Sequence, residues 1–257
     1  MKLAVRALLF PIILLVSFLA ESTHAKQAHN PPHLLKISVV DSWPPYIYID
    51  ENNQLAGQDY ELLKSVLEEM NYGLKLVSNV SDNRRFYALG HALHEVVVGA
   101  FVNEERAEVS RFSIPYRSEK MGLFYTDPDL FKGDKLELEE KFDLKPVVGV
   151  MNLAAWAGEA FEELKISYPE NILHIESQYS RLKMLELGRV DFTIGDTVSI
   201  EQRAKELKIT NFILHPDIIF EANIHFAFSK KAVDEAFMRK FNTVLSRKLA
   251  EQNIEAF

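Results

Sequence analysis

Asp196 is one of two residues whose type and position could bind a charged small molecule. It directly follows the apolar segment 192–195 (FTIG), which predicts a strand. Open α/β sheets bind ligands at the carboxyl ends of their strands, so this carboxylate could accept hydrogen bonds from a cationic group. Asp is also a common N-cap, and the helix expected over 197–207 would use it in that way. The two roles are compatible.

Arg106 is the second of these residues, and it ends the motif N-E-E-R. A planar guanidinium can donate two parallel hydrogen bonds to a carboxylate in a desolvated cleft. The spacing alone favours a surface arginine that pairs with Glu104, Glu105 or Glu108, because such weak pairs are common. A binding role for Arg106 therefore needs support from the sequence around it.

Aromatic side chains follow the first expected strand, 35–40 (LKISVV), in the segment D-S-W-P-P-Y. The two prolines force an extended turn there. The ring of Trp43 could cover an apolar or cationic part of a ligand, with Tyr46 supporting that wall, although Trp43 could equally be a core residue. If Asp41 faces a cleft, its charge would favour a basic or amide ligand.

Motifs for metal binding and catalysis are scarce. His91, His94 and Glu95 spell H-A-L-H-E, whereas zinc proteases carry H-E-x-x-H with the histidines four residues apart. Two histidines without a placed third ligand make a poor metal site. The sequence has no G-x-S-x-G, G-x-G-x-x-G or G-x-x-x-x-G-K-[ST] motif. We therefore expect no metal, no cofactor and no catalytic residue.

Composition restricts the partners and the class of protein. The 257 residues carry a formal net charge of −8, which repels nucleic-acid phosphates and anionic lipids. Cysteine is absent, which excludes disulfides, thiolate metal sites and a lipid-modified N-terminal cysteine. A hydrophobic share of 47% is typical of a globular protein with one large domain or two modest lobes.

Residues 1–25 have the pattern of a secretory signal peptide. Lys2 and Arg6 precede the apolar run 7–20, and Thr23-His24-Ala25 offers small residues at a cleavage site after Ala25. A membrane anchor is the weaker alternative, because the run of about 14 residues is shorter than the roughly 20 that span a bilayer. We expect a free periplasmic protein.

The remaining sequence alternates between strand and helix patterns. Strands are expected at 35–40, 47–49, 74–77, 95–102, 121–126, 146–150, 171–175, 190–195, 212–214 and 224–228, and helices at 57–70, 82–93, 154–164, 180–187, 197–207 and 233–250. This order indicates βαβ units and an α/β fold with parallel sheets.

The alternation runs twice, which predicts two lobes. We expect residues 33–121 and 222–257 in one lobe and 125–217 in the other. The chain would then cross between the lobes near 121–126 and again near 218–224. Two crossing strands form a hinge that suits closure of the lobes around a ligand.

Four segments resemble motifs of the type II periplasmic binding proteins for polar amino acids. They are 41–63 (DSWPPYIYIDENNQLAGQDYELL), 99–116 (GAFVNEERAEVSRFSIPY), 182–196 (LKMLELGRVDFTIGD) and 225–231 (HFAFSKK). Together they cover nearly all of the mature chain in the order and spacing of that family, the bacterial extracellular solute-binding proteins of family 3. The resemblance implies two lobes, each a mostly parallel sheet flanked by helices, joined by a two-strand hinge.

The resemblance also implies roles for individual residues. In similar proteins the arginine at the position of Arg106 binds the ligand α-carboxylate, and the aspartate at the position of Asp196 binds the α-ammonium. An aromatic ring at the position of Trp43 stacks on the ligand side chain, and an acidic residue at that of Asp41 touches the ligand in several relatives. Gly99 belongs to the same binding segment.

The sequence departs from the family pattern in two places. Phe101 stands where relatives carry a small hydroxyl residue, and Leu153 and Ala154 stand where they carry Gly-Thr at a helix start. Asn152 could compensate for the lost hydroxyl. Two groups that hold a carboxylate are thus replaced, which admits a larger or more apolar ligand.

The resemblance implies a non-enzymatic, monomeric protein that captures a small polar ligand, such as an amino acid, by lobe closure. It would deliver the ligand to an inner-membrane ABC permease or a sensor. The alternative is a periplasmic enzyme on the same scaffold, such as a cyclohexadienyl dehydratase-like lyase. That chemistry needs a general acid with a raised pKa, for which Asp41, Asp59 and Asp196 are candidates.

Overall fold

Strand β5, Val96–Ala100, is buried at all five positions and marks the middle of a sheet. The structure, a computed structural model, describes residues 33–39, 43–77, 84–144 and 147–252. The expected signal peptide (1–25) and Asp41 lie outside the described residues. All described residues belong to one unit of the chain, Pro32–Phe257.

The strands are β1 (His33–Ile37), β2 (Tyr48–Ile49), β3 (Leu55–Ala56), β4 (Tyr72–Leu76), β5, β6 (Ser110–Phe112), β7 (Arg117–Tyr125), β8 (Gly149–Met151), β9 (Ile172–His174), β10 (Phe192–Asp196), β11 (Ile213–Leu214) and β12 (Phe220–Ser229). The helices are α1 (Gln58–Glu69), α2 (Arg85–Gly90), α3 (Glu104–Val109), α4 (Leu138–Leu144), α5 (Glu159–Ser167), α6 (Gln178–Glu186), α7 (Thr197–Glu206) and α8 (Glu235–Glu251).

The first lobe is built on the strand order β4-β1-β5-β12. Strands β4, β1 and β5 are parallel, whereas β12 pairs antiparallel with β5 and β6. Helices α1 and α8 cover one face, where Leu63 and Phe241 are fully buried. Helix α2 covers the other face through Leu89, which packs with Val97 and Ala227. The lobe is therefore a sheet with helices on both faces.

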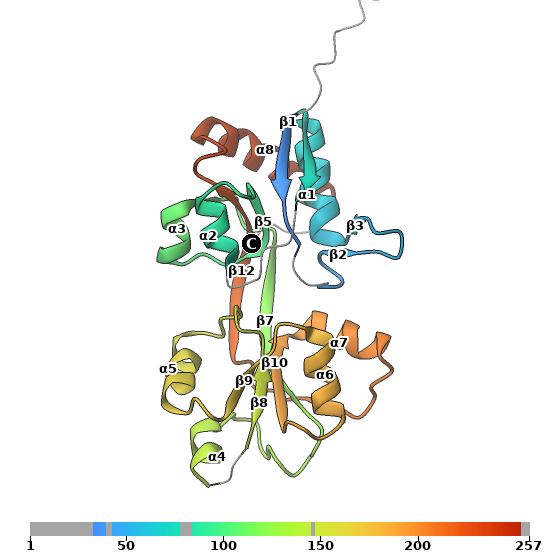
Figure 1. Cartoon of the computed structure of the whole chain (residues 1–257), viewed down its shortest axis with the longest axis vertical. Helices are drawn as coiled ribbons and strands as arrows, with labels where there is room; N and C mark the ends of the chain where they lie inside the picture. Colours follow the sequence, from blue (N-terminus) through green and yellow to red (C-terminus); the bar gives the residue numbers. More distant parts are fainter. Residues whose placement is uncertain (1–32, 40–42, 78–83, 145–146, 253–257) are drawn as a thin grey trace, which may run out of the picture. The chain divides into compact units, whose positions relative to one another are not determined.

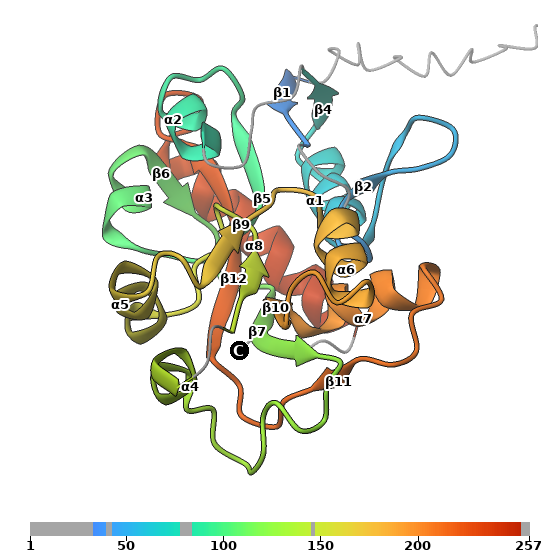
Figure 2. The same cartoon turned by 60° about the horizontal axis from the view of Figure 1, so that its bottom comes forward.

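The second lobe repeats this plan with the order β7-β10-β8-β9. Strands β10, β8 and β9 are parallel, and β7 runs antiparallel to β10. Successive side chains of a strand point to opposite faces. Thus Phe124 packs under α6 and α7, while Leu123 and Tyr125 join the core beneath α4 and α5. Figure 2 shows these helix pairs on either side of the sheet.

Strands β7 and β12 connect the two lobes. They lie side by side in Figure 1 and pair antiparallel from Arg117–Met121 to Phe220–Ile224. The two-lobed α/β architecture expected from the sequence is confirmed by these sheets. None of the helices in the described residues has the length and apolarity needed to cross a lipid bilayer.

Helices α5 and α4 and strand β7 are among the elements that differ from the sequence expectation. Helix α5 begins at Glu159, after Gly158 with φ of 92°, and not at 154. Helix α4 forms in the stretch expected to be polar, because Leu138 and Phe142, one turn apart, are buried in the second-lobe core. Strand β7 begins at Arg117 rather than Met121, so it reaches further into the first lobe.

Candidate ligand-binding cleft

A cavity of about 150 Å³ is lined by residues of both lobes. Seven of the ten residues expected at the site line it, namely Trp43, Gly99, Phe101, Arg106, Asn152, Ala154 and Asp196. Tyr46 is buried behind this lining, and Leu153 is 51% exposed at the turn before α5. The late start of α5 explains the position of Leu153, because no helix begins there to turn it inward.

Gly99 gives Trp43 its place in the cavity wall. The backbone of Gly99 has φ of 75°, and a Cβ atom there would lie 2.3 Å from Cζ3 of Trp43. The indole therefore packs directly on the glycine backbone. Tyr46 meets the same indole edge-to-face, with ring centroids 5.0 Å apart. Trp43 thus lines the cavity while it packs against the first-lobe core.

Arg106 reaches the cavity from α3. Asn103 caps that helix, because its side chain accepts a hydrogen bond of 2.8 Å from the Arg106 backbone N–H. The guanidinium lies over the rings of Phe86 and Phe101, with centroid distances of 4.4 and 3.8 Å, and donates to the Phe101 carbonyl at 3.3 Å. A stacked guanidinium is well oriented to bind an anion through its edge.

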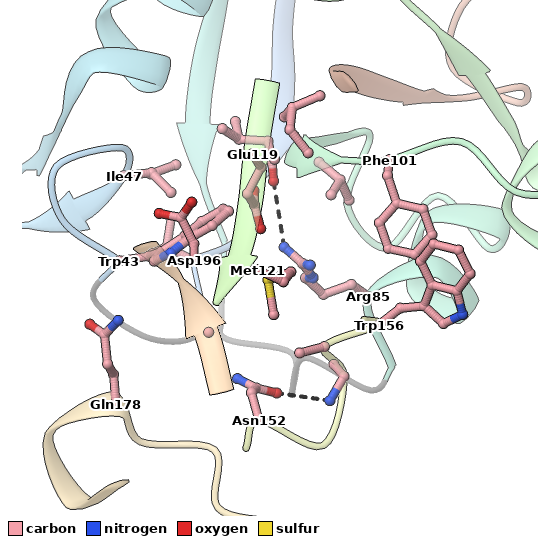
Figure 3. Close-up of a pocket in the computed structure, with 18 of the residues that line it drawn as sticks. Trp43, Ile47, Arg85, Phe101, Glu119, Met121, Asn152, Trp156, Gln178 and Asp196 are labelled. Atoms are coloured by element: carbon pink, nitrogen blue, oxygen red, sulfur yellow. Dashed lines mark hydrogen bonds between the residues drawn. The ribbon is translucent and has the colours of Figure 1, made fainter. Parts of the chain in front are cut away.

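Phe101 also links the two lobes. Its ring stacks on that of Trp156, with centroids 4.9 Å apart and planes at 22°. Trp156 meets Phe220 of β12 edge-to-face at 4.5 Å. The three aromatic side chains therefore form a cluster across the cleft, and Figure 3 shows Phe101 and Trp156 together at one side of the cavity.

Arg85 points into the cavity from the start of α2 (Figure 3). Its Nη1 atom donates to the Val98 carbonyl at 3.5 Å. Arg181 also lines the cavity and donates to the carbonyls of Ile175 and Glu176 at 2.6 Å each. No sequence motif indicated a role for either arginine, because neither lies in a segment with a recognisable binding pattern.

Asp196 has the N-cap role considered from the sequence and also lines the cavity. It is 5% exposed and caps α7, because its Oδ1 accepts a hydrogen bond of 2.8 Å from the Ser199 N–H. Burial raises the pKa of Asp196, while hydrogen bonds from the Ser199 backbone and the Tyr46 side chain oppose that rise. Tyr46 therefore supports a charged carboxylate at the edge of the cavity.

Asn152 organises the turn where relatives have Gly-Thr. Its side-chain oxygen accepts the Ala154 N–H at 2.8 Å, and its amide donates to the Glu176 carbonyl at 3.3 Å. Figure 3 shows the first of these bonds as a dashed line. The N–H of Ala154 is thus satisfied within the turn.

Glu119 is an acidic cavity residue that sequence reasoning missed. Its Oε2 accepts a hydrogen bond of 3.2 Å from Arg117, whose Nε donates to Asp59 at 3.0 Å. Tyr116 donates to the same Asp59 carboxylate at 2.6 Å. Burial, with the nearby charge of Asp196, raises the pKa of Glu119 to about 7, although the Arg117 charge lowers it. The expected strand began at Met121 and so excluded Glu119.

The two histidines of the H-A-L-H-E segment have structural partners. Nε2 of His94 lies 2.8 Å from the Arg85 carbonyl, so it must carry the hydrogen, and Nδ1 accepts from the Ser38 hydroxyl at 2.8 Å. His91 lies 2.8 Å from the Tyr87 carbonyl through Nδ1. Within the described residues, no group of three or more potential metal ligands is found.

Comparison with known proteins relates this chain to solute-binding proteins. Residues 35–145 match the model of the bacterial extracellular solute-binding proteins, family 3. A protein of Escherichia coli (strain K12), named as an ABC transporter arginine-binding protein, is 25% identical over 180 residues, which are 67% of this chain and 67% of that protein.

Solved structures share the fold. A mutant of the arginine-binding protein of T. maritima superposes with a TM-score of 0.69 at 20% identity, over 86% of this chain and 90% of its own. The ancestral amino acid-binding protein AncCDT-1, described as a precursor of cyclohexadienyl dehydratase, gives 0.67 at 20% identity, over 86% and 91%. Residues 35–145 thus resemble the bacterial extracellular solute-binding proteins of family 3, and the chain shares the two-lobed fold of these solved structures.

Proposed function

We propose that this protein captures an amino acid or a related small zwitterion by closing its lobes around the cavity. The observation that carries the proposal is that Arg106 from the first lobe and Asp196 from the second line the same cavity. A zwitterion could bind the guanidinium through its carboxylate and the aspartate through its ammonium group. The arginine-binding names of the relatives support this ligand class.

The proposal includes a mechanism of closure. Residues 33–121 and 222–257 would move as one lobe and 125–217 as the other. The crossing strands β7 and β12 would bend near 121–126 and 218–224. Closure is favourable because the ligand makes more contacts in the closed state than in the open one. The protein would act as a periplasmic monomer without catalysis and would serve an ABC permease or a sensor.

Isothermal titration against a panel of amino acids tests the proposal. We expect micromolar or tighter binding of at least one member, and Arg106→Lys should weaken it by about tenfold or more, because lysine cannot donate two parallel hydrogen bonds. Asp196→Asn removes the charge but keeps a good N-cap, so it should lose affinity without losing α7. A folded protein that binds no member of the panel would contradict the proposal.

A second candidate function rests on Glu119. A carboxyl group with a pKa of about 7 in a cleft suits general-acid catalysis at neutral pH. This would support a dehydratase-like lyase that acts on prephenate or arogenate. Purified protein should then turn over one of these acids, and Glu119→Gln should abolish that turnover. The absence of turnover would leave binding as the function.

A further inference from the structure

We propose that two aromatic rings, Phe101 from the first lobe and Trp156 from the second, position Arg106 for binding a carboxylate. We call this pair of rings the aromatic clamp. The carrying observation is a stack that runs from one lobe to the other. Cζ of Arg106 lies 3.8 Å from the centroid of the Phe101 ring, and the Trp156 ring stacks on Phe101 with centroids 4.9 Å apart. The inference rests on the proposed binding function and explains how its carboxylate-binding residue is oriented.

The two partners of Phe101 must use opposite faces of its ring. A guanidinium centred 3.8 Å over one face fills that face, and the Trp156 ring, inclined by only 22°, needs a face of its own. Phe101 therefore lies between Arg106 and Trp156. Figure 3 shows the rings of Phe101 and Trp156 against each other at one side of the cavity.

Within the first lobe, aromatic contacts set the plane of the Arg106 guanidinium. The side chain extends from α3, a helix of six residues in which no residue is buried. A second ring, that of Phe86, lies 4.4 Å from the same Cζ atom, and the Phe101 carbonyl accepts a hydrogen bond of 3.3 Å from Nη1. Ring faces fix the plane of a guanidinium, whereas its hydrogen bonds are made from the edge. The rings thus decide the direction from which a carboxylate can be bound.

The second lobe holds Trp156 through contacts of its own. The indole meets the ring of Phe220 edge-to-face at 4.5 Å, and Phe220 packs on the second-lobe core. Asn152 closes the preceding turn by accepting the Ala154 N–H at 2.8 Å. The turn ends at Gly158, where φ is 92° and a Cβ atom would lie 3.2 Å from the Phe220 ring. Trp156 is therefore presented to the other lobe by a well-packed turn.

Lobe closure completes the aromatic clamp. When the lobes separate, Trp156 leaves the face of Phe101 and water replaces it. When the lobes close, the indole covers that face and excludes water from the contact between Phe101 and Arg106. A cation–π contact is stronger in desolvated surroundings than at an exposed site. Closure therefore fixes the guanidinium as the carboxylate is enclosed, which couples recognition of the carboxylate to the movement of the lobes.

The test compares amino acids with their α-carboxamides, which lack the negative charge. L-Arginine, L-glutamine, L-histidine, L-phenylalanine and their four amides are titrated calorimetrically at pH 6.5, where the ammonium group of both forms is mostly charged. Wild-type protein should bind at least one acid at least about tenfold more tightly than its amide, because charge-assisted bidentate hydrogen bonds are strong. Trp156→Ala should reduce this ratio to below about threefold. Trp156→Phe keeps a ring that can stack, so it should hold the ratio within about twofold of the wild type.

The ratio of acid to amide affinity separates positioning from a structural role. A variant that only opens the lobes should weaken acid and amide alike and leave the ratio unchanged. Phe101→Leu keeps an apolar side chain but removes the ring, so it should lower the ratio even if Trp156→Ala folds poorly. Tyr179→Ala removes an exposed ring of the second lobe and should leave the ratio as in the wild type. In an Arg106→Lys background, Trp156→Ala should lower the ratio no further.

The outcomes distinguish the aromatic clamp from the proposed function. A wild-type ratio in well-folded Trp156→Ala and Phe101→Leu would overturn the clamp alone. Equal binding of every acid and its amide by the wild type would also overturn the clamp, because Arg106 would then recognise no carboxylate, while amino-acid capture would stand. Silence of the folded protein towards all eight compounds would overturn the proposed function, and the clamp with it.

Discussion

The ring of Phe101 stacks on the ring of Trp156 across the cleft, with centroids 4.9 Å apart and an interplanar angle of 22°. One ring belongs to the first lobe and the other to the second. The stack joins the lobes through side chains alone, beside the two connecting strands. Phe101 stands where the resemblance places a small hydroxyl residue. This departure from the family pattern provides the aromatic contact between the lobes.

Trp156→Ala should weaken the contact between the lobes. Stacked aromatic pairs contribute about 0.5–1.5 kcal/mol beyond their buried area, so we expect a more open average structure and a loss of stability of that order. Small-angle scattering and urea denaturation measure the two effects. Tyr179→Ala, which removes a 53% exposed ring from the second lobe, is the control. If the two variants show the same scattering and the same stability, the stack does not stabilise the contact between the lobes.

Gly99→Ala should displace the Trp43 indole. The added Cβ would lie 2.3 Å from the ring, and φ of 75° is unfavourable for alanine, so a loss of about 1–3 kcal/mol in stability is expected. Tryptophan fluorescence should shift, because Trp43 is one of two tryptophans in the chain. Gly133→Ala shares a positive φ of 95° but meets no atom within 4 Å, so it reports the backbone strain alone. A loss at Gly99 no larger than that at Gly133 would contradict the proposed packing.

Asp59→Ala should destabilise the connection between the lobes. The substitution removes the carboxylate that accepts hydrogen bonds from Arg117 and Tyr116. The nearly buried guanidinium of Arg117 then lacks one of its two negatively charged partners. Breaking a buried pair in this way costs about 3–5 kcal/mol, which urea denaturation would detect.

The matched control for Asp59→Ala is Glu61→Gln in the same helix. Glu61 pairs with Lys64 at 3.7 Å, and its side chain is 58% exposed. Exposed pairs of this kind contribute about 0–1 kcal/mol, so the control should change the free energy of unfolding very little. A loss below about 1 kcal/mol for Asp59→Ala would show that the buried network does not stabilise the fold.

The stability of the ligand-free protein should depend on Glu119 and pH. The pKa of Glu119 is about 7 when folded, against an ordinary 4.5, because burial and Asp196 outweigh the attraction of Arg117. Between these values the folded state binds more protons at Glu119 than the unfolded state does, so the contribution of Glu119 to stability is greatest below pH 4.5 and is lost as the pH rises through 7. The charge of Asp59 acts in the same direction as that of Asp196.

Glu119→Gln should remove this pH dependence. The pKa shift corresponds to at most about 3 kcal/mol. Between pH 4.5 and pH 8 the free energy of unfolding of the variant should therefore rise, relative to that of the wild type, by up to that amount. Urea denaturation at several pH values provides the measurement. A constant difference between the two proteins across this range would show that Glu119 titrates normally.

The sequence predicted the elements whose patterns are local. The continuous apolar run Val96-Val97-Val98 predicted the central strand β5, and the apolar spacing of Leu62, Leu63 and Val66 predicted α1. In contrast, the helix expected over 82–93 ends at Gly90 as α2, and Leu93 beyond it is 58% exposed. Element boundaries depend on caps and on neighbours, which a pattern within one segment does not contain.

By itself the sequence determined the two-lobed α/β fold, through the order of its strands and helices, and it identified Arg106, Trp43 and Asp196 as residues that line the cavity. Tertiary structure alone decided that Glu119 and Trp156 also line it. Glu119 reaches the cavity through the pairing of β7 with β10, and Trp156 through its stack on Phe101. Both depend on segments far apart in the chain, and spacing within a segment cannot specify the register between distant segments.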